Sequence, residues 1–386
     1  MPKGVSRMAE MTRRERILAA SRKQQADRLP FFHNWRHSQQ GWAERECRNR
    51  GMGLSWARPS YTMTWHGVEV TEKYETYSTG AVELRRTFKT PVGTISHVEK
   101  REPGVGQWHA NRSWRDVTPW QTERAIKGPD DYKVLKYMYE NLEFKADYFP
   151  LEQAKDWLGD DGIVWDWVPH QGIQLLMIDW VGSEGGRFFI HHVRYPDLVE
   201  EAFETIAKAY EPLWEIAAGS PADFFLLADN IDAVLVNPRL FEKYFIPEWK
   251  KCCDRMHAAG KLVGVHCDGR MAALKDLIPK TDIDVIEALH VPPMGDLTLG
   301  EALKLWPDKV IWTGFPGSVY ALGPEETKKQ ALSMLRDTGT GERVCFEVST
   351  ENQVSNENML ALTSVLENAT LPLTPEKIDG IEKAVL

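Results

Sequence analysis

The chain contains no long hydrophobic run. No apolar segment approaches the roughly 20 residues that a membrane-spanning helix needs. The basic N-terminal sequence MPKGVSRMAEMTRRERILAA also lacks the apolar stretch of a secretory signal peptide. These absences predict a protein that neither crosses a membrane nor is secreted.

Cysteine and positive charge are also scarce. Five cysteines among 386 residues leave one over in any disulfide scheme, which favours free thiols in a reducing cytoplasm. Acidic residues outnumber lysine and arginine, and the net charge of -9 at pH 7 would repel a polyanion. We therefore expect a cytoplasmic protein with no nucleic-acid or membrane partner, and the sequence leaves open whether it forms a homo-oligomer.

Several catalytic motifs are missing. The sequence contains no GxSxG, no HExxH and no phosphate-binding glycine-rich loop. No GxGxxG opens a helix after a strand, so a dinucleotide-binding fold is not indicated. The chemistry must therefore be sought in residues that the fold brings together.

From about residue 129 onward, helical patterns alternate with short apolar segments that are typical of strands. Such alternation predicts a parallel sheet of the α/β class. A first strand at 29–35 and one near 187–192 raise the count to about eight, which favours a closed TIM-type (β/α)8 barrel. The whole chain, 1–386, is then a single barrel domain. The other expected strands are 162–169, 223–229, 261–269, 284–289, 309–314 and 343–350.

Two additions to the barrel are expected. Thr12 and Glu15 form a capping box, which predicts an N-terminal helical extension at about 12–26. Residues 60–125 alternate polar and apolar side chains between turn residues, which predicts a β-hairpin-rich insertion.

Polar residues recur where the expected strands end. In a (β/α) barrel the catalytic groups lie at the carboxyl ends of the strands. This places ten candidates at one end of the barrel: Asp166, Asp229, Asn230, His266, Asp268, Glu287, His290, Glu347, Ser349 and Glu351.

The segment GVHCDG is the sharpest local signal. Side chains alternate faces along a strand, so His266 and Asp268 point the same way and Cys267 points towards the helices. Imidazole and carboxylate on one face could supply two ligands of a metal ion, with Glu347 or Glu351 as a third. The alternative is that His266 only hydrogen-bonds to a neighbour and that Glu347 pairs with an arginine such as Arg343.

Three longer segments resemble the uroporphyrinogen decarboxylase superfamily, which includes cobalamin-dependent methyltransferases. They are MTRRERILAASRKQQADRLP, LLADNIDAVLVNPRLFEKYFIPEWKKCCDRMHAAGKLVGVHCDG and VSTENQVSNENM. IWTGFP occupies the place of the superfamily's Gly-Asn-x-Asp-Pro turn. The resemblance implies a TIM-type barrel with its active site at the carboxyl ends of the strands.

Two departures from the family pattern narrow the expected activity and the expected metal ligands. Porphyrin decarboxylases carry RQAGRY after the first strand, whereas this chain has HNWRHSQQGW, so their arginine clamp for carboxylates is not reproduced. The methyltransferase branch usually holds zinc with His-x-Cys and a later Cys. Here His266-x-Asp268 and Glu351 stand in those places. The resemblance then implies a divalent ion, Zn²⁺ first, held by a set richer in oxygen ligands.

The leading hypothesis is a methyltransferase that exchanges a methyl group with the cobalt of cobalamin carried by a separate corrinoid protein. The chain itself shows no DxHxxG-type cobalamin-binding segment. Asp229, His290 and Glu287 are the candidate catalytic groups. One alternative is a decarboxylase of a porphyrinogen or another carboxylic acid. Another is a non-catalytic barrel that binds a corrinoid protein or a ligand.

The tryptophan content suggests the methyl donor. Fifteen tryptophans are present, and several stand near expected strand ends, where they could stack against an aromatic ring. We expect a methoxylated aromatic compound that loses its O-methyl group. A quaternary amine could also use an aromatic cage, and the tryptophans could instead be core residues. The predicted substrate contacts are Trp35, Asp166, Trp167, Asn230, Trp312 and Phe315.

Overall fold

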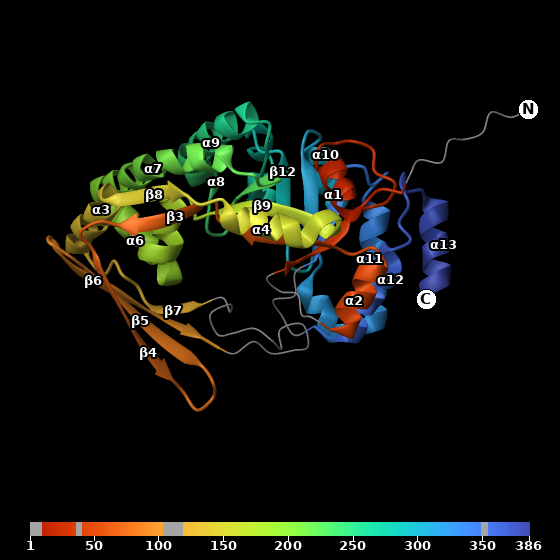
Figure 1. Ribbon diagram of the computed structural model, residues 1–386, viewed down its shortest axis with the longest axis horizontal. Coiled ribbons are helices and arrows are strands. Elements are labelled where there is room, and N and C mark those ends of the chain that lie inside the picture. Colours follow the sequence, from red (N-terminus) through yellow and green to blue (C-terminus); the bar gives the residue numbers. More distant parts are fainter. Residues whose placement is uncertain (1–9, 36–40, 103–118, 349–353) are drawn as a thin grey trace, which may run out of the picture.

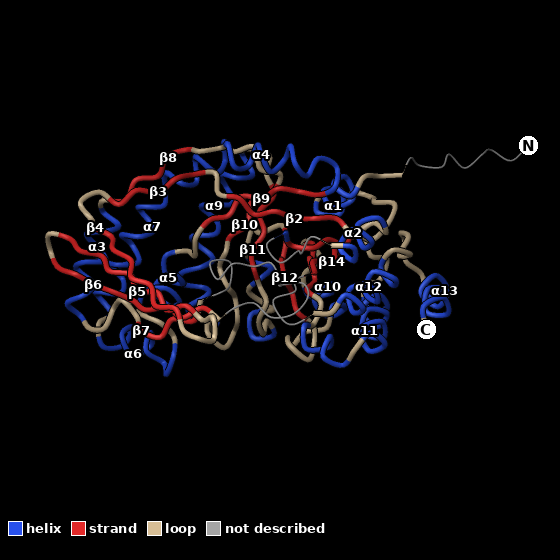
Figure 2. The backbone as a smooth tube through the Cα atoms, turned by 60° about the horizontal axis from the view of Figure 1, so that its bottom comes forward, coloured by secondary structure: helices blue, strands red, loops and turns tan. Residues whose placement is uncertain are grey.

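Eight parallel strands form a closed barrel in the computed structural model, which describes residues 10–35, 41–102, 119–348 and 354–386. The strand order around the barrel is β1-β14-β13-β12-β11-β10-β9-β2. Figure 2 shows these strands side by side in the middle of the molecule. The predicted α/β barrel is confirmed. The strands are β1 (Phe31–Asn34), β2 (Gly53–Arg58), β9 (Gly162–Val168), β10 (Phe224–Leu227), β11 (Leu262–His266), β12 (Val285–His290), β13 (Val310–Gly314) and β14 (Val344–Val348).

The barrel interior is filled by large apolar side chains near its amino-terminal end. Phe32, Trp165, Phe224 and Trp312 belong to one buried cluster, and helix α1 (Arg13–Ser21) closes that end with Ile17. Thr12 and Glu15 form the predicted capping box at the start of α1. The other, carboxyl-terminal end of the barrel is therefore the end at which polar side chains can gather.

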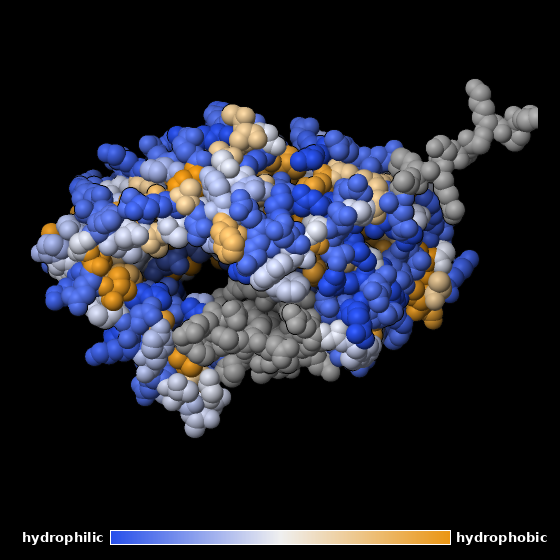
Figure 3. Space-filling view, viewed as in Figure 1, coloured by the Kyte–Doolittle hydropathy of each residue, from blue (hydrophilic) through white to orange (hydrophobic). Residues whose placement is uncertain are grey.

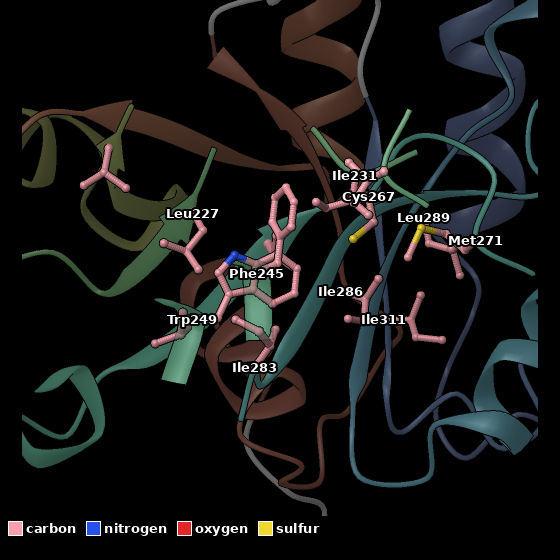
Figure 4. Packing of buried hydrophobic residues seen from close by; sticks show 14 of the residues in the cluster. Leu227, Ile231, Phe245, Trp249, Cys267, Met271, Ile283, Ile286, Leu289 and Ile311 are labelled. Carbon is pink, nitrogen blue, oxygen red and sulfur yellow. The ribbon is translucent and has the colours of Figure 1, made fainter. Parts of the chain in front are cut away.

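Helices surround the barrel and bury its outer face. Figure 4 shows part of this outer core, in which Cys267 lies among Ile231, Ile286 and Leu289. Cys267 thus faces the helices, as predicted, and all five cysteines are buried and free. Within the described segments, the α-helices of four or more residues are α1, α2 (Trp42–Asn49), α3 (Tyr132–Glu140), α4 (Phe149–Leu158), α5 (Gly172–Leu175), α6 (Arg187–Arg194), α7 (Pro196–Gly219), α9 (Ile246–Ala258), α10 (Leu299–Leu305), α11 (Pro324–Asp337), α12 (Asn356–Leu366) and α13 (Pro375–Val385).

The surface is dominated by polar residues. Within the described segments, no helix combines the length and the apolar character that crossing a bilayer requires. The face shown in Figure 3 is largely hydrophilic, with hydrophobic side chains in small separate patches.

The expected β-rich insertion forms two antiparallel sheets. One pairs β3 (Tyr61–Trp65) with β8 (Leu142–Ala146). The other has the order β4-β5-β6-β7 and lies at the opposite end of the molecule from α13 (Figure 1). We call the second one the insertion sheet. Its strands are β4 (Glu69–Thr76), β5 (Val82–Thr90), β6 (Gly93–Arg101) and β7 (Trp120–Glu123).

One barrel strand was assigned to the wrong segment. Residues 187–192 lie in helix α6 and not in a strand, and the eighth strand is β2. In α6, Phe188 and His191 are buried while Ile190 is half exposed, which is the spacing of an amphipathic helix. The positions of β2 that face the barrel interior include Gly53 and Ser55, so the segment lacks the apolar pattern of a strand.

Two expected helices are shorter than predicted. Residues 142–144 were expected to continue the helix that is now α3, but they belong to β8 because they pair with β3. Residues 271–280 form only short 3₁₀ turns. Pro279 lacks a backbone N–H and cannot take part in a regular helical hydrogen bond there.

Candidate active site at the barrel mouth

A cluster of ionisable side chains lies at the carboxyl ends of strands β11 to β14. His266 and Glu287 are register partners on the neighbouring strands β11 and β12. Glu347 of β14 is the register partner of Gly314 on β13. The carboxyl group of Glu347 interacts with that of Glu287 on β12, across β13. We call His266, Asp268, Glu287, His290 and Glu347 the mouth cluster.

His266 lies between two carboxylates. Its Nδ1 is 2.5 Å from Glu287 Oε2, and its Nε2 is 3.4 Å from Asp268 Oδ2. Burial acts to lower the pKa of His266, but the charges and hydrogen bonds of both carboxylates outweigh it and hold that pKa well above its usual value. The protonated imidazolium is therefore the form that this arrangement stabilises.

Glu287 and Glu347 form a hydrogen-bonded carboxyl pair. Burial and the neighbouring charge of Glu287 raise the pKa of Glu347 well above its usual value. Burial would also raise the pKa of Glu287, but the charge and hydrogen bond of His266 and the hydrogen bond of Glu347 lower it overall. Glu287 is therefore the ionised member, and Glu347 keeps the proton.

A bulge in β12 turns His290 into the barrel. The register with β13 shifts between Ile286 and Leu289, and Ala288 has a positive φ of 57°. The extra residue reverses the alternation, so Glu287 and His290 face the same side. The His290 ring then packs over Gly314, where an added Cβ would lie 2.6 Å from its Cε1.

His290 is neutral in this position. Its Nδ1 lies 2.7 Å from the carbonyl oxygen of Ala288, so Nδ1 carries the proton and Nε2 is left as an acceptor. Burial lowers its pKa, although Asp268 acts in the opposite direction. His290 thus suits the role of a base or a ligand better than that of an acid.

Two of the predicted metal ligands lie together in the structure. His266 and Asp268 share the inner face of the strand end, as predicted, and the Nδ1 contact with a buried carboxylate is typical of metal-binding histidines. Glu351 lies outside the described residues. Glu347 is engaged with Glu287 on the Nδ1 side of His266, away from Nε2. Among the residues that are described, no three His, Cys, Asp or Glu side chains form a group that could hold a metal ion.

Asp229 is buried beneath the rim of the barrel mouth. Its Oδ1 accepts the backbone N–H of Gln171 at 2.7 Å, and its Oδ2 accepts the indole N–H of Trp249 at 2.7 Å. Burial raises its pKa to about 6 against these hydrogen bonds. Both oxygens are occupied by donors, so Asp229 holds the loop after β9 against helix α9.

Three predicted substrate contacts are corrected by the structure. Trp312 is 1% exposed, stacks on Phe224 and donates its indole N–H to Ser21 of α1, so it belongs to the barrel core. Phe315 is 2% exposed and packs against Tyr320 in the outer core. Trp312 of β13 lies below the mouth in the barrel interior, and Phe315, which directly follows β13, lies in the outer core.

Asp166 is the third of these corrections. It is fully buried and accepts the backbone N–H of Ser60, and burial raises its pKa to about 6. The inward positions of β9 are Trp165 and Trp167, so Asp166 between them faces out of the barrel.

The remaining predicted substrate contacts differ in where they lie relative to the barrel mouth. Trp167 follows Trp165 on the inner face of β9 and is 39% exposed, so its ring is accessible at the mouth. Trp35 packs on Trp56, which belongs to a cluster outside the barrel wall. The backbone N–H of Asn230 donates to Gln174, and contact of its side chain with a substrate remains a prediction.

A second histidine–carboxylate pair was not predicted. His170 follows β9 by two residues, and its Nδ1 is 2.7 Å from Oδ2 of Asp179 in the π-helical turn Leu176–Trp180. The charges of Asp229 and His266 also affect the pKa of His170, so it lies near the mouth cluster. The signal was available, because His170 directly follows the expected strand 162–169.

Comparison by sequence finds one family. Residues 177–362 match the model of the uroporphyrinogen decarboxylase (URO-D) family. This region includes strands β10 to β14 and the whole mouth cluster. A search of curated proteins finds no match.

Comparison by structure supports the same fold. The chain is similar to a methyltransferase from Methanosarcina mazei, with a TM-score of 0.52 and 13% sequence identity over 92% of this chain and 98% of that one. A malate synthase of Haloferax volcanii, in a complex with magnesium and glyoxylate, gives a TM-score of only 0.26 at 10% identity, over 92% of this chain and 85% of that one. At 13% identity, the likeness to the methyltransferase concerns the fold.

Proposed function

Residues 177–362 of this chain match the model of the uroporphyrinogen decarboxylase family, and from this premise we propose that the protein is a methyltransferase of that superfamily. It would move a methyl group between a methylated small molecule and the cobalt of a separate corrinoid protein. The similarity of its fold to a methyltransferase supports this proposal.

The acidic character of the mouth cluster is the main observation in support of a methyltransferase. Three carboxyl groups, of Asp268, Glu287 and Glu347, surround a single imidazolium. Within the described residues, no arginine or lysine is paired with them. A porphyrinogen carries several carboxylates and would be repelled by such a site, whereas a neutral or cationic methyl donor would not.

The residues at the mouth can assist departure of the methyl-bearing heteroatom. Charge develops on that atom as the methyl group leaves, and a proton donor or a cation beside it stabilises the transition state. Bound Zn²⁺ would supply Lewis-acid activation of the same atom. His266 Nε2 and Asp268 are the described groups that would hold such an ion.

We propose an O-methyl ether of an aromatic compound as the methyl donor. Trp167 is the aromatic side chain that is accessible at the mouth, and stacking on it would contribute about 0.5–1.5 kcal/mol beyond the burial of apolar area. A quaternary amine would use the same ring through cation–π attraction.

The test is a methyl-transfer assay with purified protein. Cob(I)alamin is incubated with guaiacol-like ethers, methylamines or methanol, and methylcobalamin is followed by its visible spectrum. Formation of methylcobalamin only with the ethers supports the full proposal. Turnover of amines or methanol alone excludes an aryl methyl ether as the methyl donor. Release of CO₂ from a porphyrinogen without methyl transfer would favour a decarboxylase.

A matched pair of variants connects the activity with the mouth cluster. Glu287→Gln removes the charge that orients His266, while Glu204→Gln makes the same change on the exposed face of α7. We expect the first variant to lose most of its activity and the second to keep it.

A further inference from the structure

The pair formed by His170 and Asp179 has a place beside the mouth cluster but no assigned role. His170 stands at the carboxyl end of β9, the end of a barrel at which catalytic groups gather. Its side chain is 23% exposed and that of Asp179 is 37% exposed, so neither is sealed in the core.

The hydrogen bond between them fixes the orientation of the imidazole. Asp179 engages Nδ1 at 2.7 Å, which leaves Nε2 as the nitrogen that can meet a ligand. In the described part of the chain, this bond is the only one recorded for the His170 ring. A carboxylate on Nδ1 both orients an imidazole and stabilises its protonated form.

Three other titratable groups at the mouth are less suited to donate a proton. Both oxygens of Asp229 already accept hydrogen bonds, and His290 keeps its proton on the Nδ1 that binds a carbonyl oxygen. The proton of Glu347 is used in its bond with Glu287.

We propose that His170, positioned by Asp179, is the general acid that protonates the leaving heteroatom of the methyl donor. This inference rests on the proposed function. In the step, the bond between the methyl carbon and the heteroatom breaks, and its electron pair stays on the heteroatom. The methyl carbon bonds to cobalt(I) of the corrinoid substrate, which gives up two electrons and becomes cobalt(III). The proton on His170 Nε2 passes to the heteroatom and leaves a neutral product.

The charged groups around the pair are consistent with this role. Burial lowers the pKa of His170, but Asp179 and then Asp229 raise it above the usual value, while His266 acts in the lowering direction. Asp179 in turn lies near Arg124 and near His97 of the insertion sheet, since its charge affects the pKa of both. His97 is 7% exposed, and neither of its ring nitrogens has a hydrogen-bond partner among the described residues.

The experiment compares substrates whose leaving groups differ in acidity. Aryl methyl ethers are offered to the wild type and to His170→Gln, with cob(I)alamin as the acceptor. For ethers of weakly acidic phenols, we expect kcat to fall by about 10²–10⁴-fold and KM to change little. For ethers of strongly acidic phenols the loss should nearly vanish, because their phenolates leave without a proton.

Two further variants keep the test informative. Asp179→Asn should shift the alkaline limb of the kcat/KM profile to lower pH, because it removes the charge that stabilises imidazolium. His257→Gln is the matched control, because His257 makes a 2.8 Å pair with Asp284 at the other end of the barrel. It should leave kcat unchanged.

The outcomes separate the two proposals. An active wild type together with an equally active His170→Gln, or with a loss that is the same for every leaving group, overturns the role of His170 alone. If the wild type forms no methylcobalamin with any of the methyl donors offered, the proposed function is overturned, and the role of His170 with it.

Discussion

The buried carboxyl pair makes a prediction about stability that needs no substrate. Glu287 and Glu347 are 4% and 3% exposed, and the native protein keeps one proton on the pair. In the unfolded chain both carboxyl groups are ionised above pH about 4.3. The native state therefore holds one more proton from this pair than the unfolded state does, up to the raised pKa of Glu347.

The direction and the size of the change in unfolding free energy with pH follow from proton linkage. Because the native state binds the extra proton, the free energy of unfolding falls as pH rises, by about 1.4 kcal/mol per pH unit. Glu347→Gln keeps an N–H donor towards Glu287 but has no proton to lose. As pH rises from 6 towards the raised pKa of Glu347, the variant should gain stability relative to the wild type, by at most about 1.4 kcal/mol per pH unit.

Urea unfolding followed by circular dichroism at pH 6, 7 and 8 measures this difference. Glu204→Gln on the exposed face of α7 is the control and should follow the wild type at each pH. His266 is present in all three proteins, so its own titration cancels in the comparison. If the wild type and Glu347→Gln lose stability in parallel between pH 6 and pH 8, Glu347 is not the protonated member of the pair.

Three further predictions concern single side chains. Trp249→Phe should destabilise the protein by about 1–3 kcal/mol in urea unfolding, because it leaves Oδ2 of buried Asp229 without a donor; an unchanged midpoint would show that another donor replaces it. At Ala288, whose φ is 57°, substitution by Gly should stabilise by up to about 1 kcal/mol and substitution by Val should destabilise by at least as much; equal midpoints for the two variants would contradict the bulge. Purified wild type should contain a divalent metal that His266→Ala lacks, and equal stoichiometric metal in both would exclude His266 as a ligand.

Much of the barrel could be predicted because its buried strands have strong patterns. The segments that became β9 to β14 are short apolar runs bounded by helices, and each carries polar residues where it ends. The alternation rule also placed His266 and Asp268 on one face and Cys267 on the other. β2 was missed since its positions facing the barrel interior include Gly53 and Ser55, which do not produce an apolar pattern.

The site was harder to predict because it depends on contacts between strands. His290 faces the barrel only because a bulge at Ala288 reverses the alternation. The pairing of Glu287 with Glu347 joins β12 and β14, two strands that are not adjacent in the barrel. Trp312 was expected at the mouth, but the curvature of a closed barrel places it in the core next to Phe224.

The pair of His170 and Asp179 joins a strand end to a helical turn nine residues later in the chain. No motif in the sequence marks such a contact. Only the π-helical geometry of Leu176–Trp180 brings the carboxylate of Asp179 to the imidazole.

The most direct test of the central claim is the stoichiometry of methyl transfer from an aryl methyl ether to cob(I)alamin. The account predicts that each cob(I)alamin consumed yields one methylcobalamin and one demethylated phenol. It also predicts that Glu287→Gln abolishes most of this turnover, whereas Glu204→Gln does not. An absence of methylcobalamin with every ether, amine and alcohol offered would contradict the account.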